Sequence, residues 1–258
     1  MDILHSLILG IIEGVTEFLP ISSTAHLVMA AKVMQIAQTD FVKSFEIIIQ
    51  FGAILSVIVL YWRRFLVDME SLKRVLAAFI PTAILGFLLY KVIKNYLISN
   101  DLIIVWALFL GGLILILFEM WHKEDASALA DISQIPYSKC IAIGLFQSLA
   151  MFPGVSRSAA TIIGGLILNL KRQTIVEFSF LLAVPTMLAA SVLDLLKSGS
   201  SFSTSQIGVL AVGFITSFII AILSIKFLIN YIQKHTFIPF GIYRIAIAVL
   251  FAASMVLN

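Results

Sequence analysis

The chain has 258 residues, of which 61% are hydrophobic and only 12% are charged, and its mean hydropathy is +1.09. Soluble domains carry about 25% charged residues, so this composition excludes a soluble globular protein and indicates an integral membrane protein. The net charge of +3 does not indicate nucleic-acid binding, because lysine and arginine gather in the cytoplasmic loops of membrane proteins.

The first predicted element is a broken apolar segment, Ile3–Ile36, which PISST interrupts at Pro20–Thr24. Three segments follow that are long enough to span a bilayer, which takes about 20 apolar residues. A polar connection over about His122–Pro136 leads to a second broken segment, Lys139–Leu170, which PGVSRS interrupts at Pro153–Ser158. Three more spans complete the chain. The six predicted spans are Phe45–Trp62, Val75–Val92, Leu102–Trp121, Ile175–Leu196, Ile207–Ile229 and Phe240–Leu257.

Each broken segment reads as two short helices joined by a proline-led, hydroxyl-rich elbow. Neither half is long enough to span, so each pair is predicted to enter the membrane and return on the same side. Irregular backbone at that depth requires protein or water around it. We therefore expect the first elbow, at Pro20–Thr24, and the second elbow, at Pro153–Ser158, to cover each other.

An internal repeat is indicated by matching positions in the two halves. Pro20 and Pro153 are separated by the same distance in sequence as Phe45 and Phe178. Each half, about 1–125 and 137–258, then holds one re-entrant hairpin and three spans. Because three is odd, the second half must insert inverted relative to the first. The predicted fold is a single all-α polytopic membrane domain, 1–258, with an inverted-topology repeat.

The basic residues predict the orientation, because cytoplasmic loops are enriched in lysine and arginine. On this topology one side receives Arg63, Arg64, Lys73, Arg74, Lys123, Lys139, Lys171, Arg172 and Lys234. The other side receives fewer, namely Lys32, Lys43, Lys91, Lys94 and Lys197. The first side is therefore predicted to be cytoplasmic, with both termini and the mouth of the first hairpin facing outward.

Two carboxylates, Glu13 and Glu17, lie in the first broken segment and project from the same face of a helix. Two neighbouring carboxylates in a low-dielectric site need a shared proton or a cation. The alternative is a helix end near enough to water to hydrate both. We expect them to bind a divalent cation, Mg²⁺ or Ca²⁺.

Three hydroxyl residues, Ser22, Ser23 and Thr24, open the helix after the first elbow. Capping by one of them is expected, since hydroxyls accept bonds from free N–H groups at a helix start. Three exceed what a cap needs, and a helix N-terminus with hydroxyls makes an anion site. His26 lies within one turn, where it is either a hydrogen-bonded core histidine or a proton-transfer group, and we favour the second.

The second elbow repeats this pattern with an added charge. Ser156 and Ser158 flank Arg157, and Thr161 follows one turn later. The planar guanidinium of Arg157 suits a phosphate or a carboxylate. Its alternative role is an ion pair to Glu13 or Glu17, and an empty site could keep that pair until an anion arrives. Acid, arginine and serine groups inside hydrocarbon indicate a metal-associated phosphate ester or anhydride of a lipid.

Weaker candidates are Glu46, Gln50 and Gln147, which are polar residues in apolar stretches. For each, an interhelical hydrogen bond is the simpler interpretation. Tyr243 and Arg244, at the start of the last span, are interpreted as anchors at the membrane interface.

Two motifs, EGVTEFLPISSTAH and PGVSRSAAT, resemble the signatures of the bacitracin-resistance family of undecaprenyl-diphosphate phosphatases. The resemblance covers essentially the whole chain, including FEIIIQFGAILSVI, EFSFLLAVP and FIPFGIYR. It implies an inner-membrane hydrolase that converts undecaprenyl diphosphate to the monophosphate carrier used in peptidoglycan synthesis, cell-wall biogenesis and cell-shape maintenance. It also implies six spans, two re-entrant hairpins, a homodimer, an outward-opening site and antagonism by bacitracin, which sequesters the substrate.

Two positions depart from the family motifs. Ala25 replaces the glycine of SSTGH, and Ala159 replaces the glycine that follows SRS. If those glycines provide a positive φ or a close backbone approach, the alanines would alter the phosphate cradle.

The predicted mechanism is metal-assisted phosphoryl transfer, with catalytic residues Glu13, Glu17, Ser23, His26 and Arg157. Arg157 would hold the diphosphate with Ser22, Thr24, Ser156, Ser158 and Thr161, and Glu13 and Glu17 would bind the metal. Ser23 is the preferred nucleophile with His26 as its base. Alternatively, His26 or Glu17 activates water and Ser23 only positions the phosphate.

Two rival functions come from other classes. Inverted repeats with broken helices also build transporters, and a lipid-phosphate flippase could use the same anion site. Translocation does not need the acid–histidine–serine cluster, which favours the enzyme. A scaffolding role is disfavoured by charged residues in apolar segments.

Overall fold

The computed structural model describes residues 1–92, 100–198 and 206–257, so Lys94, which was counted for the predicted orientation, lies outside the described part. The described residues form helices and one isolated β-bridge, between Leu129 and Leu170. The helices are α1 (Ile3–Thr16), α2 (Ser23–Val33), α3 (Asp40–Leu60), α4 (Trp62–Leu66), α5 (Met69–Val92), α6 (Asp101–Trp121), α7 (Tyr137–Ser148), α8 (Arg157–Ile167), α9 (Arg172–Ser198), α10 (Ile207–Tyr231) and α11 (Ile238–Leu257). Two 3₁₀ turns, η2 (Ile132–Gln134) and η3 (Leu149–Met151), flank α7.

Six of these helices, α3, α5, α6, α9, α10 and α11, are long and apolar enough to cross a membrane. They confirm the six predicted spans, and the all-helical fold is confirmed with them. Several begin earlier than predicted, because polar residues open them. Thr39 and Asn100, for example, accept hydrogen bonds from the first N–H groups of α3 and α6.

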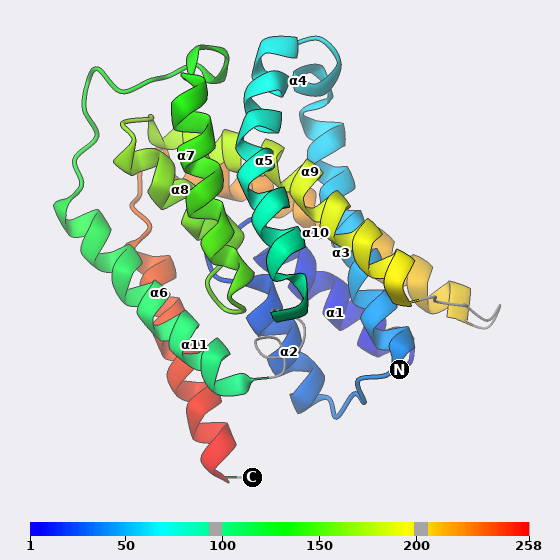
Figure 1. The fold of residues 1–258 in the computed structure, drawn as a ribbon. Coiled ribbons are helices and arrows are strands. Elements are labelled where there is room, and N and C mark those ends of the chain that lie inside the picture. The colour runs from blue at the N-terminus through cyan, green and yellow to red at the C-terminus, as the bar shows by residue number, and fades with distance from the viewer. Residues whose placement is uncertain (93–99, 199–205, 258) are drawn as a thin grey trace.

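Two helical pairs are too short to cross. The longest member, α1, has 14 residues and therefore rises about 21 Å, less than the ~30 Å of a hydrocarbon core. In Figure 1 the pair α1–α2 lies in the half of the molecule that holds both termini, and α7–α8 lies in the opposite half with α4. Their elbows meet between the two halves. The re-entrant path and the inverted repeat remain predictions.

The two pairs share local detail. The helices α2 and α8 each have 11 residues. Each follows a serine with a positive φ, which is 73° at Ser22 and 76° at Ser156. Residues other than glycine rarely adopt a positive φ, so the backbone is strained at the same position of both elbows.

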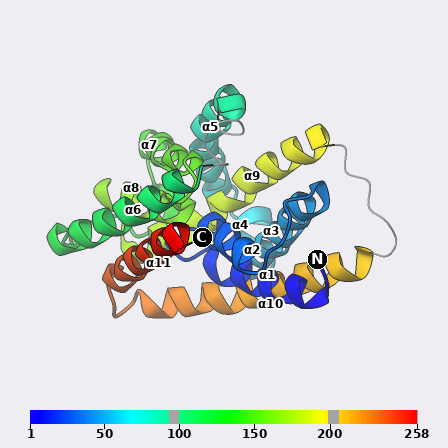
Figure 2. The same ribbon diagram turned by 90° about the horizontal axis from the view of Figure 1, so that it is seen from below.

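The helices approach closely where glycines remove side chains. Figure 2 shows α1 alongside α10, and a Cβ atom at Gly14 would lie 2.8 Å from the carbonyl oxygen of Ser217. Small residues are the usual means of packing helices in a membrane, where the hydrophobic effect between helices is absent. The position of α1, and with it that of both glutamates, therefore depends on Gly10 and Gly14.

The contact of α5 with α7 gives a stability prediction. A Cβ at Gly144 would lie 2.0 Å from the backbone oxygen of Ala78, so Gly144→Ala must separate the two helices. We expect a loss of about 1–3 kcal/mol, seen as a lower melting temperature in detergent. Gly208→Ala is the matched control, because no atom of the described residues lies within 4 Å of its added Cβ. Equal melting temperatures for both variants would contradict this packing.

Candidate active site

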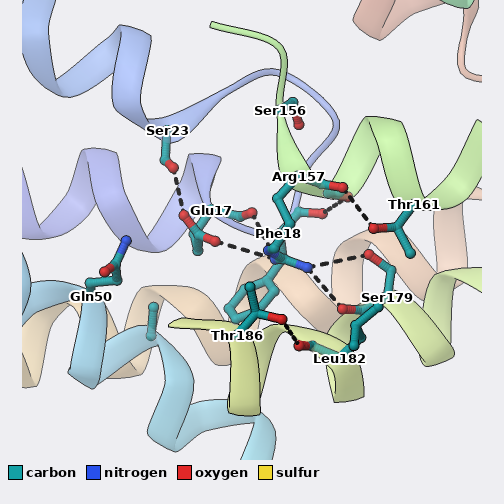
Figure 3. A network of polar contacts seen from close by, with 12 residues as sticks. Glu17, Phe18, Ser23, Gln50, Ser156, Arg157, Thr161, Ser179, Leu182 and Thr186 are labelled. Atoms are coloured by element: carbon teal, nitrogen blue, oxygen red, sulfur yellow. Dashed lines mark hydrogen bonds and ion pairs between the residues drawn. The ribbon is translucent and has the colours of Figure 1, made fainter. Parts of the chain in front are cut away.

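Where the two elbows meet, a carboxylate and a guanidinium from distant parts of the sequence lie close together. Arg157 Nη2 lies 3.2 Å from Glu17 Oε1, and the two side chains are only 10% and 6% exposed. Figure 3 shows this pair between the two elbows. A buried pair of this kind is costly to break, because either partner alone would be an uncompensated charge.

Ser23 joins the same cluster. Its hydroxyl donates to Glu17 Oε2 at 2.5 Å, a short bond typical of a hydroxyl and a carboxylate. Glu17 therefore lies between Arg157 on one oxygen and Ser23 on the other (Figure 3). The contact makes Glu17 the natural acceptor for the Ser23 proton.

Capping differs between the elbows. Ser156 accepts a hydrogen bond from the N–H of Ala159 at 3.2 Å, as a cap should. In the described structure Ser22 makes no such bond at the start of α2, and Ser23 is turned to Glu17. The capping expected at the first elbow is therefore not found. The first N–H groups of α2 keep the partial positive charge that attracts anions.

Arg157 has donors left over. Its Nη1 donates to the carbonyl oxygen of Ser179 at 2.8 Å, and its guanidinium lies over the ring of Phe18 at 5.9 Å. Its Nε is buried and has no acceptor among the described residues. Buried donors normally find a partner, so an unpaired one beside a cavity points to an acceptor that binds there.

Glu13 is fully buried, and neither of its carboxylate oxygens has a hydrogen-bond partner in the described part of the chain. Together with Glu17, one turn away, it offers the oxygen donors that Mg²⁺ and Ca²⁺ prefer. No group of three or more His, Cys, Asp or Glu side chains suited to a metal occurs among the described residues. The two glutamates therefore fit a cation whose remaining ligands are water or phosphate oxygens.

A cavity of about 120 Å³ lies at the crossing of the elbows. Its lining residues are Glu17, Ser22, Ser23, Thr24, Gln50, Ala150, Pro153, Gly154, Ser156, Arg157 and Met187. Six predicted site residues line it, and Gln50 joins them while also accepting a hydrogen bond from Ser191 at 3.2 Å. The other predicted residues, Glu13, His26, Ser158 and Thr161, lie outside this lining in the described structure.

His26 has both ring nitrogens engaged away from Ser23. Nδ1 lies 2.7 Å from the carbonyl oxygen of Ser22, and Nε2 lies 2.9 Å from the hydroxyl of Tyr243. The two rings also stack, with parallel planes and centroids 5.5 Å apart. In this structure Ser23 therefore donates its hydrogen bond to Glu17 and not to His26.

Ser158 and Thr161 support the second elbow from behind. Ser158 donates to the carbonyl oxygen of Phe18 at 2.8 Å, which ties α8 to the first elbow. Thr161 donates to the carbonyl oxygen of Arg157 at 2.9 Å. Gln147 donates to Thr82 and Thr186 at 3.0 Å each, so its interpretation as an interhelical hydrogen-bond residue is confirmed.

Arg244 was predicted to be an interface anchor, and that prediction is wrong. Its side chain is 0% exposed, and its guanidinium donates to five backbone carbonyls. These are Ala107 and Leu108 on α6, Pro20 in the first elbow, and Gly154 and Val155 in the second. The one available signal was its charge inside a predicted span, where an arginine must find partners.

The two alanines do not disturb the site. Neither Ala25 nor Ala159 has a positive φ, and both lie within the first turn of regular helices. Ala25 is fully buried and packs with Ile104 and Leu108 of α6. No left-handed glycine is needed at either position, and alanine favours the helix by about 1 kcal/mol.

Comparison with known proteins agrees with this geometry. Residues 6–250 match the family described as bacitracin resistance protein BacA. A protein of Aquifex aeolicus named undecaprenyl-diphosphatase is 53% identical over 96% of this chain and 97% of its own length. Proteins of the same name from Sulfurihydrogenibium and Persephonella marina are 52% and 49% identical, each over 97% of this chain and 98% of their own. The chain belongs to the BacA family.

Proposed function

We propose that the chain hydrolyses undecaprenyl diphosphate to undecaprenyl phosphate and inorganic phosphate. The observation that carries this proposal is the Ser23–Glu17–Arg157 contact chain at the crossing of the elbows. It supports the proposal because a hydroxyl, a carboxylate and a guanidinium line one cavity, as a nucleophile, a proton acceptor and a phosphate-binding cation would have to. The names of the relatives, undecaprenyl-diphosphatase, indicate the same reaction.

The surroundings support a lipid substrate. Two of the residues that line the cavity, Gln50 on α3 and Met187 on α9, come from helices long and apolar enough to cross a membrane, so the rest of its ligand must be compatible with hydrocarbon. An undecaprenyl chain meets that condition. Its monophosphate is the carrier lipid for cell-wall polymers, and hydrolysis of the diphosphate returns it to use.

Binding of the substrate changes the role of Glu17. The incoming terminal phosphate accepts hydrogen bonds from Arg157, whose Nε is free in the described structure, and from N–H groups at the start of α2. The guanidinium of Arg157 then pairs with the phosphate and no longer with Glu17. Glu17, released from its ion pair, becomes a stronger base for the Ser23 proton.

The chemical steps follow from that arrangement. Ser23 Oγ forms a bond to the terminal phosphorus while its proton passes to Glu17, and the bond from phosphorus to the bridging oxygen breaks. Undecaprenyl phosphate leaves with the bridging oxygen. Glu17 gives that proton to the departing undecaprenyl phosphate and is a carboxylate again. It then takes a proton from a water that attacks the phosphoserine, inorganic phosphate leaves, and the proton returns from Glu17 to Ser23 Oγ. In the alternative, Glu17 deprotonates a water that attacks directly, and Ser23 only positions the phosphate.

A divalent cation, Mg²⁺ or Ca²⁺, belongs to the proposal. Glu13 and Glu17 would hold it, because Glu13 has two unpartnered oxygens in the described part of the chain. When bound, the cation offsets the negative charge of the diphosphate. Removal with a chelator is part of the test below.

The cellular setting is also proposed. The distribution of basic residues supports a cytoplasmic position for α4 and the 122–136 connection in a bacterial inner membrane, with the first hairpin opening to the outer face. The chain would act as a homodimer, and bacitracin would oppose it by sequestering the diphosphate. A flippase remains the rival, but moving a lipid phosphate needs no Ser23–Glu17 pair.

The nucleophile can be tested directly. Purified protein in detergent is mixed with undecaprenyl diphosphate labelled with ³²P in the terminal phosphate, quenched with acid, and digested for mass spectrometry. We expect labelled phosphoserine at Ser23, and a loss of kcat of about 10³-fold or more in Ser23→Ala. A chelator should stop turnover, and Mg²⁺ or Ca²⁺ should restore it. Full activity in Ser23→Ala would instead establish direct attack by water.

A further inference from the structure

Three residues outside the cavity lining hold the backbone of the elbows in the described structure. Arg244 and Tyr243 are neighbours on α11, and His26 lies on α2 beside Tyr243. We call His26, Tyr243 and Arg244 the elbow clamp. Three of its contacts end on main-chain carbonyls of residues that line the cavity, Ser22 and Gly154, or directly precede one that does, Val155.

Arg244 acts on both elbows at once. Nη1 donates to Pro20 at 3.2 Å and to Val155 at 3.0 Å, and Nη2 donates to Gly154 at 3.0 Å. None of the described ion pairs includes Arg244, so these carbonyls are its compensation for burial. A fully buried cation fixed by carbonyls of two separate loops cross-links those loops.

Room for this cross-link is built into the neighbouring helices. A Cβ at Gly111 would lie 2.0 Å from Arg244 Nη2, and one at Gly112 would lie 2.7 Å from the carbonyl oxygen of Gly241. Any larger residue at Gly111 would displace the guanidinium. The close approach of α6 and α11, visible in Figure 1, therefore lets Arg244 reach the elbows.

The second arm of the clamp passes through His26. The Ser22 carbonyl can only accept, so Nδ1 must be the protonated nitrogen, and Nε2 then accepts the hydrogen bond of the Tyr243 hydroxyl. The Ser22 carbonyl thereby fixes the tautomer, Tyr243 completes the hydrogen bonds of the ring, and His26 holds the carbonyl of Ser22, whose φ is 73°. Arg244 holds Val155, next to Ser156 with its φ of 76°.

These contacts orient the donors of the cavity. In a planar trans peptide unit the C=O and the following N–H point in opposite directions. Because the carbonyls of Ser22 and Val155 face the clamp, the N–H groups of Ser23 and Ser156 point away from it. Both residues line the cavity. The clamp thus presents N–H groups to an anion.

We propose that His26, Tyr243 and Arg244 are positioning residues for phosphoryl transfer, and that His26 holds the Ser22 carbonyl and does not transfer the proton. The proposal rests on the proposed function, in which Ser23 and Glu17 carry the proton transfer. It differs from the expectation drawn from the motif, where His26 was the base.

The test uses a substitution that separates the two roles of an imidazole. His26→Asn keeps an N–H donor near the place of Nδ1 but cannot take up a proton, whereas His26→Ala keeps neither. We expect His26→Asn to retain kcat within about tenfold of the wild type, since one neutral hydrogen bond is lost. His26→Ala should lose about 10²-fold through misplacement of the elbow. Equal, complete loss in both variants would overturn the proposal.

A double-mutant cycle tests whether Tyr243 acts through His26. Tyr243→Phe removes only the hydroxyl and should lower kcat about 3–10-fold with KM unchanged. In the His26→Asn background the same change should have no further effect, because the Nε2 contact is already gone. Additive effects would contradict the chain from Tyr243 to His26. Tyr137→Phe, on the exposed start of α7, is the matched control.

Arg244→Lys and Arg244→Met test the other arm. Lysine keeps the charge but cannot reach five carbonyls, and methionine has neither the charge nor a donor. We expect kcat to fall about 10²-fold in both variants, and less in Arg244→Lys than in Arg244→Met. Arg172→Lys is the control, since Arg172 pairs with Glu119 away from the elbows. Melting temperatures show which variants are folded, and an active, folded Arg244→Met would overturn this arm. If the wild-type protein released no phosphate from undecaprenyl diphosphate, the proposed function would fail instead.

Discussion

Replacing Arg157 by alanine is expected to lower kcat/KM for undecaprenyl diphosphate by about 10³-fold or more, the range seen when a cation that stabilises a transferring phosphoryl group is removed. The reason is local. Arg157 holds Glu17 at 3.2 Å and keeps one buried donor, Nε, without an acceptor in the described structure. Phosphate release from purified protein in detergent is the measurement.

Arg157→Lys is the informative companion. Lysine keeps the positive charge near Glu17 but loses the fork that can hold Glu17, the Ser179 carbonyl and a phosphate together. We therefore expect a melting temperature near that of the wild type, with kcat/KM still reduced about 10²-fold. Wild-type turnover in Arg157→Lys would mean that only charge is needed. Wild-type turnover in Arg157→Ala would remove Arg157 from the site.

How much of this site could be predicted depends on the kind of contact. An ion pair of Arg157 with Glu13 or Glu17 was one of the two roles that the sequence left open for Arg157, because ionisable residues lie beside a proline-led break in each broken apolar segment. Charged side chains in hydrocarbon must find partners. The sequence has two predicted breaks, and their non-helical backbone segments can shield each other from lipid. The six spans followed from length and composition alone.

Contacts to main-chain carbonyls could not be predicted in the same way. The acceptors of Arg244 are carbonyls of five different residues, and every residue type carries a carbonyl. Its position four residues into a predicted span resembled that of an interface anchor. Only the close packing of α6 on α11, at Gly111 and Gly112, shows that the side chain points inward.

His26 and Ser23 show a similar limit. Their spacing places both within one helical turn, which suits a base and its nucleophile. Side-chain direction decides otherwise, because Ser23 points back across the elbow to Glu17 and His26 points to Ser22 and Tyr243. Spacing along a helix predicts which residues are near each other, whereas hydrogen-bond partners depend on the elements that pack around them.

Glu17→Gln is expected to abolish turnover while leaving substrate binding intact or tighter. Glutamine can still accept the hydrogen bond from Ser23, but it cannot take up the proton, so kcat should fall by about 10³-fold. Glu17 also competes with phosphate for Arg157 in the resting site. Removing its charge frees the guanidinium, so KM should not rise, and inhibition by inorganic diphosphate should become stronger.

This pair of changes distinguishes a catalytic role from general damage. A misfolded or loosened site would bind substrate and diphosphate more weakly, together with its lower kcat.

Glu13→Gln provides the matched comparison, because Glu13 is one turn away and equally buried, with no partner for its carboxylate in the described structure. As a metal ligand alone, Glu13 should shift the Mg²⁺ or Ca²⁺ midpoint upward and recover turnover at high metal concentration. Glu17→Gln should not recover at any metal concentration, since its missing function is proton transfer. If metal restored turnover to Glu17→Gln, Glu17 would act only as a metal ligand. Another group would then have to accept the Ser23 proton.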